Sequence, residues 1–242
     1  MVCALIKMGG KGVRFGEQYP KQFYQIGGIP LFAHVLEKYN RVEVVDKYII
    51  VSNSEWMDIT YEYSGRILGD KLLEITSGGT TNARSTYNGV MCAAKYLNRD
   101  DILLVHDITD PIIDERAIRE VIRAGQEYKC AAIVTEQVHT LYRKNEEGYI
   151  TGTIDRQTVG SGYSPEAFRF EVVYACYENA TEQELENMTS AMALVQAHHI
   201  NPKAVISHQA DLKITYQEDM EALKLMIANG EQLYQERTGR DV

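Results

Sequence analysis

The sequence predicts an α/β fold, a mostly parallel sheet with helices on both faces. Through residue 136, short apolar runs alternate with longer segments of helical periodicity, which is typical of repeated β-α-β units. The chain has 242 residues, 45% of them hydrophobic and 24% charged, which excludes a disordered, collagen-like or coiled-coil protein. Because no repeat or Pro/Ser-rich linker interrupts it, we expect one domain over residues 1–242.

Five short apolar runs predict the strands of the first half: Val2–Met8, Tyr48–Ser52, Leu72–Thr76, Ile102–His106 and Ala131–Thr135. Amphipathic segments between them predict helices at about Pro30–Tyr39, Ser54–Leu68, Asn82–Leu97 and Asp114–Glu127. A helix follows most of these strands, and parallel pairing is therefore expected.

The regular alternation ends near residue 136. A hairpin is predicted at His139–Arg156, because polar Asn145–Gly148 suits a turn and Tyr149, Thr151 and Thr153 alternate on the return. This arm, about residues 137–160, is either a lid or subunit-exchange element or an ordinary surface hairpin. Beyond it we expect, in order, helices at Pro165–Ala180 and Asn187–His199, short segments at Ala204–Ser207 (a strand) and Leu212–Thr215, and an amphipathic helix at Gln217–Gln235.

The charge balance limits the partners of the protein. Its 25 Lys and Arg against 34 Asp and Glu give a net charge of −9, which disfavours nucleic acid and anionic membranes and requires a local basic pocket for any anionic ligand. No apolar stretch reaches the ~20 residues of a membrane span, and the N-terminus lacks a signal peptide. We therefore expect a cytoplasmic protein. Buried reduced thiols are expected at the four cysteines, which lack CxxC spacing: Cys3, Cys92, Cys130 and Cys176.

A glycine-rich loop follows the first predicted strand, from Met8 to Gly16. Glycines let backbone N–H groups approach phosphate oxygens closely, so we expect a phosphate site. The spacing fits neither GxGxxG nor GxxxxGK[ST], which disfavours a dinucleotide site and a Walker-type NTPase. The local basic cluster that an anion needs is present at Lys7, Lys11, Arg14 and Lys21. The alternative is a flexible turn with solvated cations.

Four motifs in order resemble those of the cytidylyltransferases that act on polyol phosphates, the methylerythritol-phosphate and ribitol-phosphate enzymes. The first is G-G-x-G-x-R-x-G from Gly9, with P-K-Q-F at Pro20–Phe23. The others are Gly78–Gly89, similar to G-G-x-x-R-x-x-S-x-x-N-G, Val105–Asp107, similar to V-H-D, and Leu212–Thr215, similar to N-I-K-[IV]-T. The resemblance covers residues 1 to about 228.

The resemblance implies a Rossmann-like fold and transfer of CMP from CTP to a polyol phosphate, with Mg²⁺ or another divalent cation and release of pyrophosphate. In such enzymes the arginine of the loop and the P-K-Q lysine, here Arg14 and Lys21, stabilise charge at the α-phosphate. The CTP-binding residues that it implies are Met8, Gly9, Gly10, Lys11, Gly12, Arg14, Lys21, Gly79, Thr80 and Ser85. For Ser85, the alternative is a plain serine near a helix N-terminus.

On the acceptor side, Asp107 matches a family aspartate near the acceptor and the metal-bound triphosphate, and it is the candidate metal ligand. We expect His106 to be only its structural neighbour. Thr153–Arg156 resembles the family's T-[VI]-D-R, whose arginine reaches into the neighbouring subunit's site, so the resemblance implies a homodimer; the alternative for Arg156 is a pair with a nearby acid. The acceptor-binding residues implied are Asp107, Thr140, Arg156, Thr189 and Lys213, and the catalytic residues are Arg14, Lys21, Asp107, Arg156 and Lys213.

The chain departs from the family pattern mainly around the acceptor. Asp110 stands where an arginine is expected, Asn82 replaces the arginine of the G-G-x-x-R motif, and Thr189–Ala191 replaces T-D-[DE]. These changes are compatible with an altered polyol-phosphate specificity, with relocated phosphate partners or with lost catalysis. We favour a cytidylyltransferase with a ribitol-phosphate-like acceptor. The alternatives are a non-enzymatic nucleotide-binding paralogue and a general sugar-nucleotide pyrophosphorylase.

Overall fold

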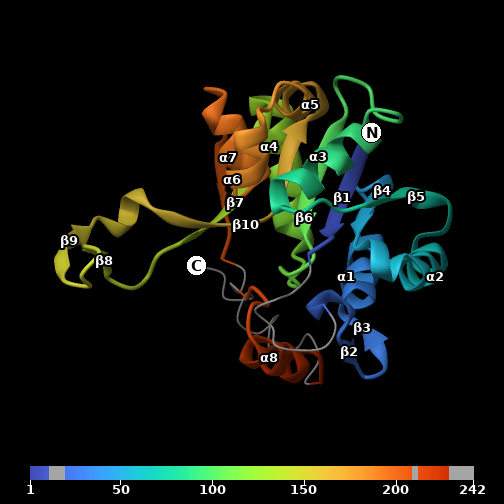
Figure 1. Ribbon diagram of the computed structural model, residues 1–242, viewed down its shortest axis with the longest axis horizontal. Helices are drawn as coiled ribbons and strands as arrows, with labels where there is room; N and C mark the ends of the chain where they lie inside the picture. The colour runs from blue at the N-terminus through green and yellow to red at the C-terminus, as the bar shows by residue number, and fades with distance from the viewer. Residues whose placement is uncertain (11–19, 209–211, 229–242) are drawn as a thin grey trace.

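The computed structural model describes residues 1–10, 20–208 and 212–228, which fold around a seven-stranded sheet (Figure 1). The strand order is β11 (Lys203–Ile206), β7 (Cys130–Glu136), β10 (Gly160–Arg169), β6 (Ile102–Asp107), β1 (Val2–Met8), β4 (Lys47–Ser52) and β5 (Leu72–Ser77). All neighbours pair in parallel except β10, which is antiparallel to both β6 and β7. The predicted mostly parallel sheet is therefore confirmed.

The two faces of the sheet bury separate hydrophobic cores, because successive side chains of a strand point to opposite faces. On β1, Ala4, Ile6 and Met8 join one core, and Cys3 and Leu5 join the other. The first core packs against α1 (Leu31–Asn40), α2 (Met57–Leu68), α4 (Glu115–Tyr128) and α8 (Gln217–Ala228). The second packs against α3 (Asn82–Ala93), α5 (Phe170–Glu178), α6 (Glu182–Asn187) and α7 (Ala191–Ala197).

Short elements complete the described fold. Strands β2 (Gln25–Ile26) and β3 (Ile29–Pro30) form a small hairpin, whose turn needs the positive φ of Gly27 and Gly28. The 3-10 helices are η2 (Lys21–Phe23), η3 (Ser54–Trp56), η4 (Gly69–Lys71) and η5 (Arg156–Thr158). None of the helices within these ranges has the length and apolar character that crossing a lipid bilayer requires.

The predicted hairpin is confirmed as β8 (Leu141–Lys144) paired with β9 (Ile150–Ile154). Gly148 closes its turn with φ 90° and donates its N–H to the carbonyl of Asn145. Figure 1 shows this arm projecting sideways from the sheet. Several of its large apolar side chains are exposed: Val138, Tyr142, Tyr149 and Ile150.

The helix predicted at Pro165–Ala180 is wrong over its first part. Residues up to Arg169 belong to β10, and the helix begins only at Phe170. Charged and apolar residues alternate across this boundary, so the local pattern does not show where the strand ends. Pairing with β6 on one side and β7 on the other makes this segment a strand.

The other differences lie at the C-terminal end. The helix predicted at Asn187–His199 is shorter in the structure, where α7 begins only at Ala191, because Met188 is extended and Ser190 caps α7 by accepting the N–H of Ala193. Helix α6, which ends at Asn187, was not predicted. Leu212–Thr215 is irregular. Helix α8 confirms the start of the last predicted helix, whose expected end at Gln235 lies outside the described residues. All four cysteines are buried and free, as predicted.

Candidate functional site

Several of the predicted site residues lie at the carboxyl ends of the parallel strands, the edge at which open α/β sheets bind their ligands. Lys7 and Asp107 are register partners at the ends of β1 and β6. Gly9 and Gly10 leave β1 at this edge, and Gly78 follows β5 with its N–H donated to the carbonyl of Ser52 at the end of β4. Segments far apart in sequence are thereby brought together.

One part of the candidate site carries predicted CTP-binding residues, and we name it the nucleotide side. It consists of Gly9, Gly10, Gly78, Gly79 and Ser85. A Cβ on Gly9 would lie 2.9 Å from Cα of Gly78, and a Cβ on Gly78 would lie 2.9 Å from Cα of Gly9, so the two backbones pack directly. Ser85 accepts the N–H of Gly79 at 3.0 Å and donates to the carbonyl of Thr81 at 2.9 Å. Ser85 thus fixes the Gly78–Gly79 turn, beyond being a serine in the first turn of α3.

Gln22 holds the start of the glycine-rich loop and was not among the predicted site residues. Its buried amide donates to the carbonyls of Met8, at 2.7 Å, and Gly10, at 2.6 Å. The P-K-Q-F motif contains this residue, but nothing in its spacing indicates that its amide reaches back to the loop. The predicted residues Lys11, Gly12 and Arg14 lie outside the described residues.

Lys21 reaches the segment that carries Lys213. Its Nζ donates to the carbonyl of Ile214, and the N–H of Ile214 donates to the carbonyl of Thr109 at 2.8 Å. Lys21, the predicted catalytic lysine of the first motif, therefore contacts the short segment 212–215, which carries Lys213 of the last motif.

A closed ring of interactions, which we name the acceptor side, connects Asp107, Asp110, Ser164 and Lys213. The N–H of Asp107 donates to Oγ of Ser164 at 3.1 Å, and this hydroxyl donates to Oδ2 of Asp110 at 2.6 Å. Nζ of Lys213 lies 3.0 Å from Oδ1 of Asp110 and 3.5 Å from Oδ2 of Asp107. The acid at position 110 is therefore paired with Lys213.

Burial and neighbouring charges shift the two carboxyl groups differently. Burial raises the pKa of Asp107, but Lys213, Lys7 and the hydrogen bonds from Thr109 outweigh it and hold that pKa at about 2. Burial and the charge of Asp107 raise the pKa of Asp110 against the opposing effect of Lys213. Asp107 is the more accessible carboxylate, with 31% of its side chain exposed against 5% for Asp110.

A single accessible carboxylate fits Mg²⁺, which protein sites commonly hold by one or two carboxylates together with substrate phosphates. Asp107 is that carboxylate. Among the described residues there is no cluster of three or more acidic, His or Cys side chains arranged to hold a metal ion. The described residues therefore do not form a metal site made of protein ligands alone.

His106 lies fully buried beside Asp107 and packs edge-on against Tyr39, with ring centroids 4.9 Å apart. Burial lowers its pKa to about 3, so the ring is neutral at physiological pH. A buried, neutral ring is consistent with the purely structural role that we predicted for His106 beside Asp107.

The remaining predicted acceptor residues are dispersed. Thr189 lies between α6 and α7, where its carbonyl accepts the side-chain N–H of Asn82 at 2.5 Å. Arg156 follows β9, and its guanidinium donates to the carbonyl of Val138 at 2.7 Å within the arm. Thr140 precedes β8 at the base of the same arm. Arg156 and Thr140 both belong to the arm, which projects away from the sheet (Figure 1).

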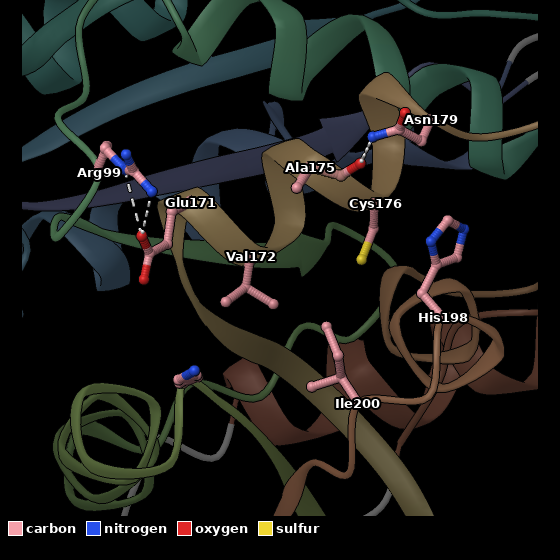
Figure 2. A pocket seen from close by; sticks show the side chains of 9 residues that line it. Arg99, Glu171, Val172, Ala175, Cys176, Asn179, His198 and Ile200 are labelled. Atoms are coloured by element: carbon pink, nitrogen blue, oxygen red, sulfur yellow. Dashed lines mark hydrogen bonds and ion pairs between the residues drawn. The ribbon is translucent and has the colours of Figure 1, made fainter.

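An open cavity of about 440 Å³ lies at the opposite edge of the sheet (Figure 2). Its walls include Val172, Cys176 and Ile200, and Arg99 pairs with Glu171 at its rim. It contains none of the predicted site residues.

Comparison with known proteins identifies the family of the chain. The family model for "2-C-methyl-D-erythritol 4-phosphate cytidylyltransferase" (IspD) matches residues 2–229. A ribitol-5-phosphate cytidylyltransferase of Lacticaseibacillus paracasei is 27% identical over 233 residues, covering 96% of this chain and all of that protein. The D-ribitol-5-phosphate cytidylyltransferase of Rattus norvegicus is 27% identical over 232 residues, but the chain spans only 52% of its length.

The solved structures agree on the fold. A 4-diphosphocytidyl-2C-methyl-D-erythritol synthase from Anaerococcus prevotii superposes with a TM-score of 0.77 at 25% identity, covering 93% of this chain and 95% of that one. The Rossmann-like α/β architecture is thus confirmed.

Proposed function

Because the chain belongs to the IspD cytidylyltransferase family, as the four motifs predicted, we propose that it transfers CMP from CTP to a polyol phosphate and releases pyrophosphate. The observation that carries this proposal is the junction of Lys21 with the segment of Lys213 beside Asp107. It places two cations and a carboxylate at the edge where the glycine-rich backbone begins.

The reaction needs no nucleophile from the protein. A phosphate oxygen of the acceptor attacks the α-phosphorus of CTP, the bond to the bridging oxygen of the β-phosphate breaks, and pyrophosphate leaves with the negative charge. Lys21, with Arg14 from the undescribed part of the loop, stabilises the charge that develops on the α-phosphate. A Mg²⁺ ion bound through Asp107 and the phosphates would neutralise further charge.

Base selection belongs to the nucleotide side. The Gly78–Gly79 turn is fixed by Ser85, so its backbone groups form a rigid edge for a pyrimidine. Thr80 adjoins this turn and completes the predicted cytosine contacts. A rigid edge favours one base because a mismatched base leaves polar groups unpaired.

The acceptor phosphate requires more positive charge than one chain offers, since both carboxylates of the acceptor side face Lys213. We therefore propose that Arg156, with Thr140, enters the site of a second copy, making the active protein a cytoplasmic homodimer of single-domain chains. Exposed Val138, Tyr142, Tyr149 and Ile150 on the arm supply an apolar surface for that contact. The acceptor that we favour resembles ribitol 5-phosphate, with 2-C-methyl-D-erythritol 4-phosphate as the alternative.

The pairing of Lys213 with Asp107 and Asp110 also supports a second candidate function. In this alternative the protein is a nucleotide-binding paralogue with impaired catalysis and a regulatory or scaffold role. Two carboxylates within 3.5 Å of Nζ of Lys213 compete with any phosphate for this cation. Such a protein binds CTP without releasing pyrophosphate.

Two assays decide among these functions. CTP with Mg²⁺ should raise the melting temperature more than ATP, GTP or UTP, because a ligand that binds only the native state stabilises it. Equal shifts from all four nucleotides would reject cytidylyl transfer in favour of a general pyrophosphorylase. Pyrophosphate release is then measured with ribitol 5-phosphate, methylerythritol phosphate and other polyol phosphates. A CTP-specific shift without release would support the impaired paralogue.

A further inference from the structure

Lys7 is a buried lysine at the end of the central strand, with 7% of its surface exposed. It follows Cys3 and Leu5 on the face covered by α3, α5 and α7, and Asp107 is its register partner on β6. Burying an ammonium group costs more free energy than burying an apolar side chain of similar size. A lysine at this position therefore calls for a specific role.

The side chain of Lys7 connects the sheet to α3. Its Nζ lies 2.8 Å from Oδ1 of Asn82, the first residue of that helix. An ammonium group only donates hydrogen bonds, so the amide of Asn82 must turn its oxygen toward Lys7. Its Nδ2 then faces the carbonyl of Thr189, to which it donates at 2.5 Å. Lys7, Asn82 and Thr189 form a chain of two hydrogen bonds that we name the relay.

A second contact ties the same region to the sheet. Oε2 of Glu166 on β10 accepts the N–H of Met192 at 3.3 Å, in the first turn of α7. Glu166 is the register partner of Val105 on β6, two residues before Asp107, so Glu166 and Asp107 lie on the same face as Lys7. Residues 189–192 are thus held over the site edge at one end by the relay and at the other by Glu166.

The charges around Lys7 explain why it tolerates burial. The positive charge of Lys7 favours the ionised forms of Asp107 and Glu166, and burial opposes ionisation of both. The relay uses a neutral amide as the hydrogen-bond acceptor, which leaves the charge of Lys7 available to these two carboxylates.

We propose that Lys7 and Asn82 are positioning residues for the acceptor: the relay holds Thr189 and the segment 189–192 as the wall of the acceptor pocket. This inference rests on the proposed function, because it assigns the wall to the acceptor and leaves CTP to the nucleotide side. The relay therefore sets the affinity for the polyol phosphate with little effect on the affinity for CTP.

Three variants separate the two hydrogen bonds of the relay. Lys7→Met removes the donor on β1 with a side chain of similar length. Asn82→Asp keeps an oxygen for Lys7 but loses the donor to Thr189, and Asn82→Leu loses both contacts. Asn179→Asp is the matched control, because Nδ2 of Asn179 likewise donates to a backbone carbonyl, that of Ala175 at 2.8 Å, at the opposite edge of the sheet.

Steady-state kinetics with the best acceptor give the first measurement. Asn82→Asp and Asn82→Leu should raise the acceptor KM by about 10-fold and change the CTP KM by less than about 2-fold, and Lys7→Met should act in the same direction. The control should change neither constant. Equal increases in both KM values in the relay variants would overturn the proposal, because a general disturbance of the site does not discriminate between substrates.

Hydrogen exchange of the amides of residues 189–194 gives a measurement independent of turnover. Exchange there should accelerate in all three relay variants relative to wild type and the control. Unchanged exchange would overturn the relay even if activity fell. Wild-type protein that turns over no polyol phosphate would instead overturn the proposed function and the acceptor role with it, while exchange would still decide whether the relay holds this segment.

Discussion

The nucleotide side and the acceptor side of the candidate site are built in different ways. The nucleotide side is made by backbones in direct contact, with Gly9 against Gly78 and the Gly79 amide bound to Ser85. The acceptor side is made by charged side chains, with Lys213 between Asp107 and Asp110. The close approach of the two backbones is possible only with glycine at positions 9 and 78. The interactions among charged side chains, in contrast, change with each substitution and with pH. We expect the first to be the rigid half and the second to be the adaptable half.

The largest expected effect concerns Lys21, which contacts the segment that carries Lys213. Lys21→Ala should lower turnover by about 10²-fold or more, as expected for removing a charge partner of the transition state. Lys71→Ala is the control, since Lys71 also lies in a 3-10 helix but enters β5 at the far edge. Steady-state turnover and the melting temperature are measured for both. Near-normal turnover of Lys21→Ala would remove this residue from the chemistry.

A mixing experiment tests whether the acceptor side is shared between two chains. Arg156→Ala and Lys21→Ala proteins should each be nearly inactive, and subunit exchange should restore about a quarter of wild-type activity, because half of the dimers are mixed and each has one intact site. Pyrophosphate release after mixing is the measurement. If exchange is demonstrated and no activity returns, Arg156 does not complete the site of a partner.

The rigid half is tested by adding one carbon. Gly78→Ala places a Cβ 2.9 Å from Cα of Gly9, so the two segments must separate, and the CTP KM should rise by about 10-fold. In Gly65→Ala the new Cβ meets nothing within 4 Å, and kinetics should stay unchanged. Parallel CTP titrations compare the two. An unaltered CTP KM in Gly78→Ala would show that this close approach is dispensable.

The smallest expected effect concerns pH and the adaptable half. Asp107 has a pKa of about 2 in the folded protein against an ordinary value of 3.8, so its ionised form stabilises the fold above pH 3.8 and this contribution is lost as the pH falls toward 2. Asp107→Asn should therefore lose less stability than wild type between pH 4 and pH 2. Urea midpoints at several pH values measure the difference. Parallel curves for the two proteins would contradict the assigned charge interaction.

The same contrast explains what could be predicted from sequence. Five strands (β1, β4, β5, β6 and β7), the arm and the nucleotide side follow from local patterns. These patterns are apolar runs of strand length, turn residues, and glycines whose spacing matches a known family. Position 110 could be recognised as unusual, but its partner lies 103 residues away, and only the fold shows that it is Lys213. Lys7 was predicted as one cation of a basic cluster, yet its hydrogen bond to Asn82 depends on how α3 docks on the sheet. β10 was missed for a similar reason, since its two neighbouring strands define it.

The contact of Lys21 with the carbonyl of Ile214 has a consequence for protein synthesis. It joins residues 193 positions apart, and Lys213 and its pairing with Asp107 and Asp110 depend on the same late segment. A growing chain can fold its first β-α units as they leave the ribosome, since domains form while translation proceeds at roughly 5–20 residues per second. The two lysines cannot meet until residue 215 has emerged. If the protein acts as proposed, we therefore expect nascent chains to be inactive until this late segment has folded.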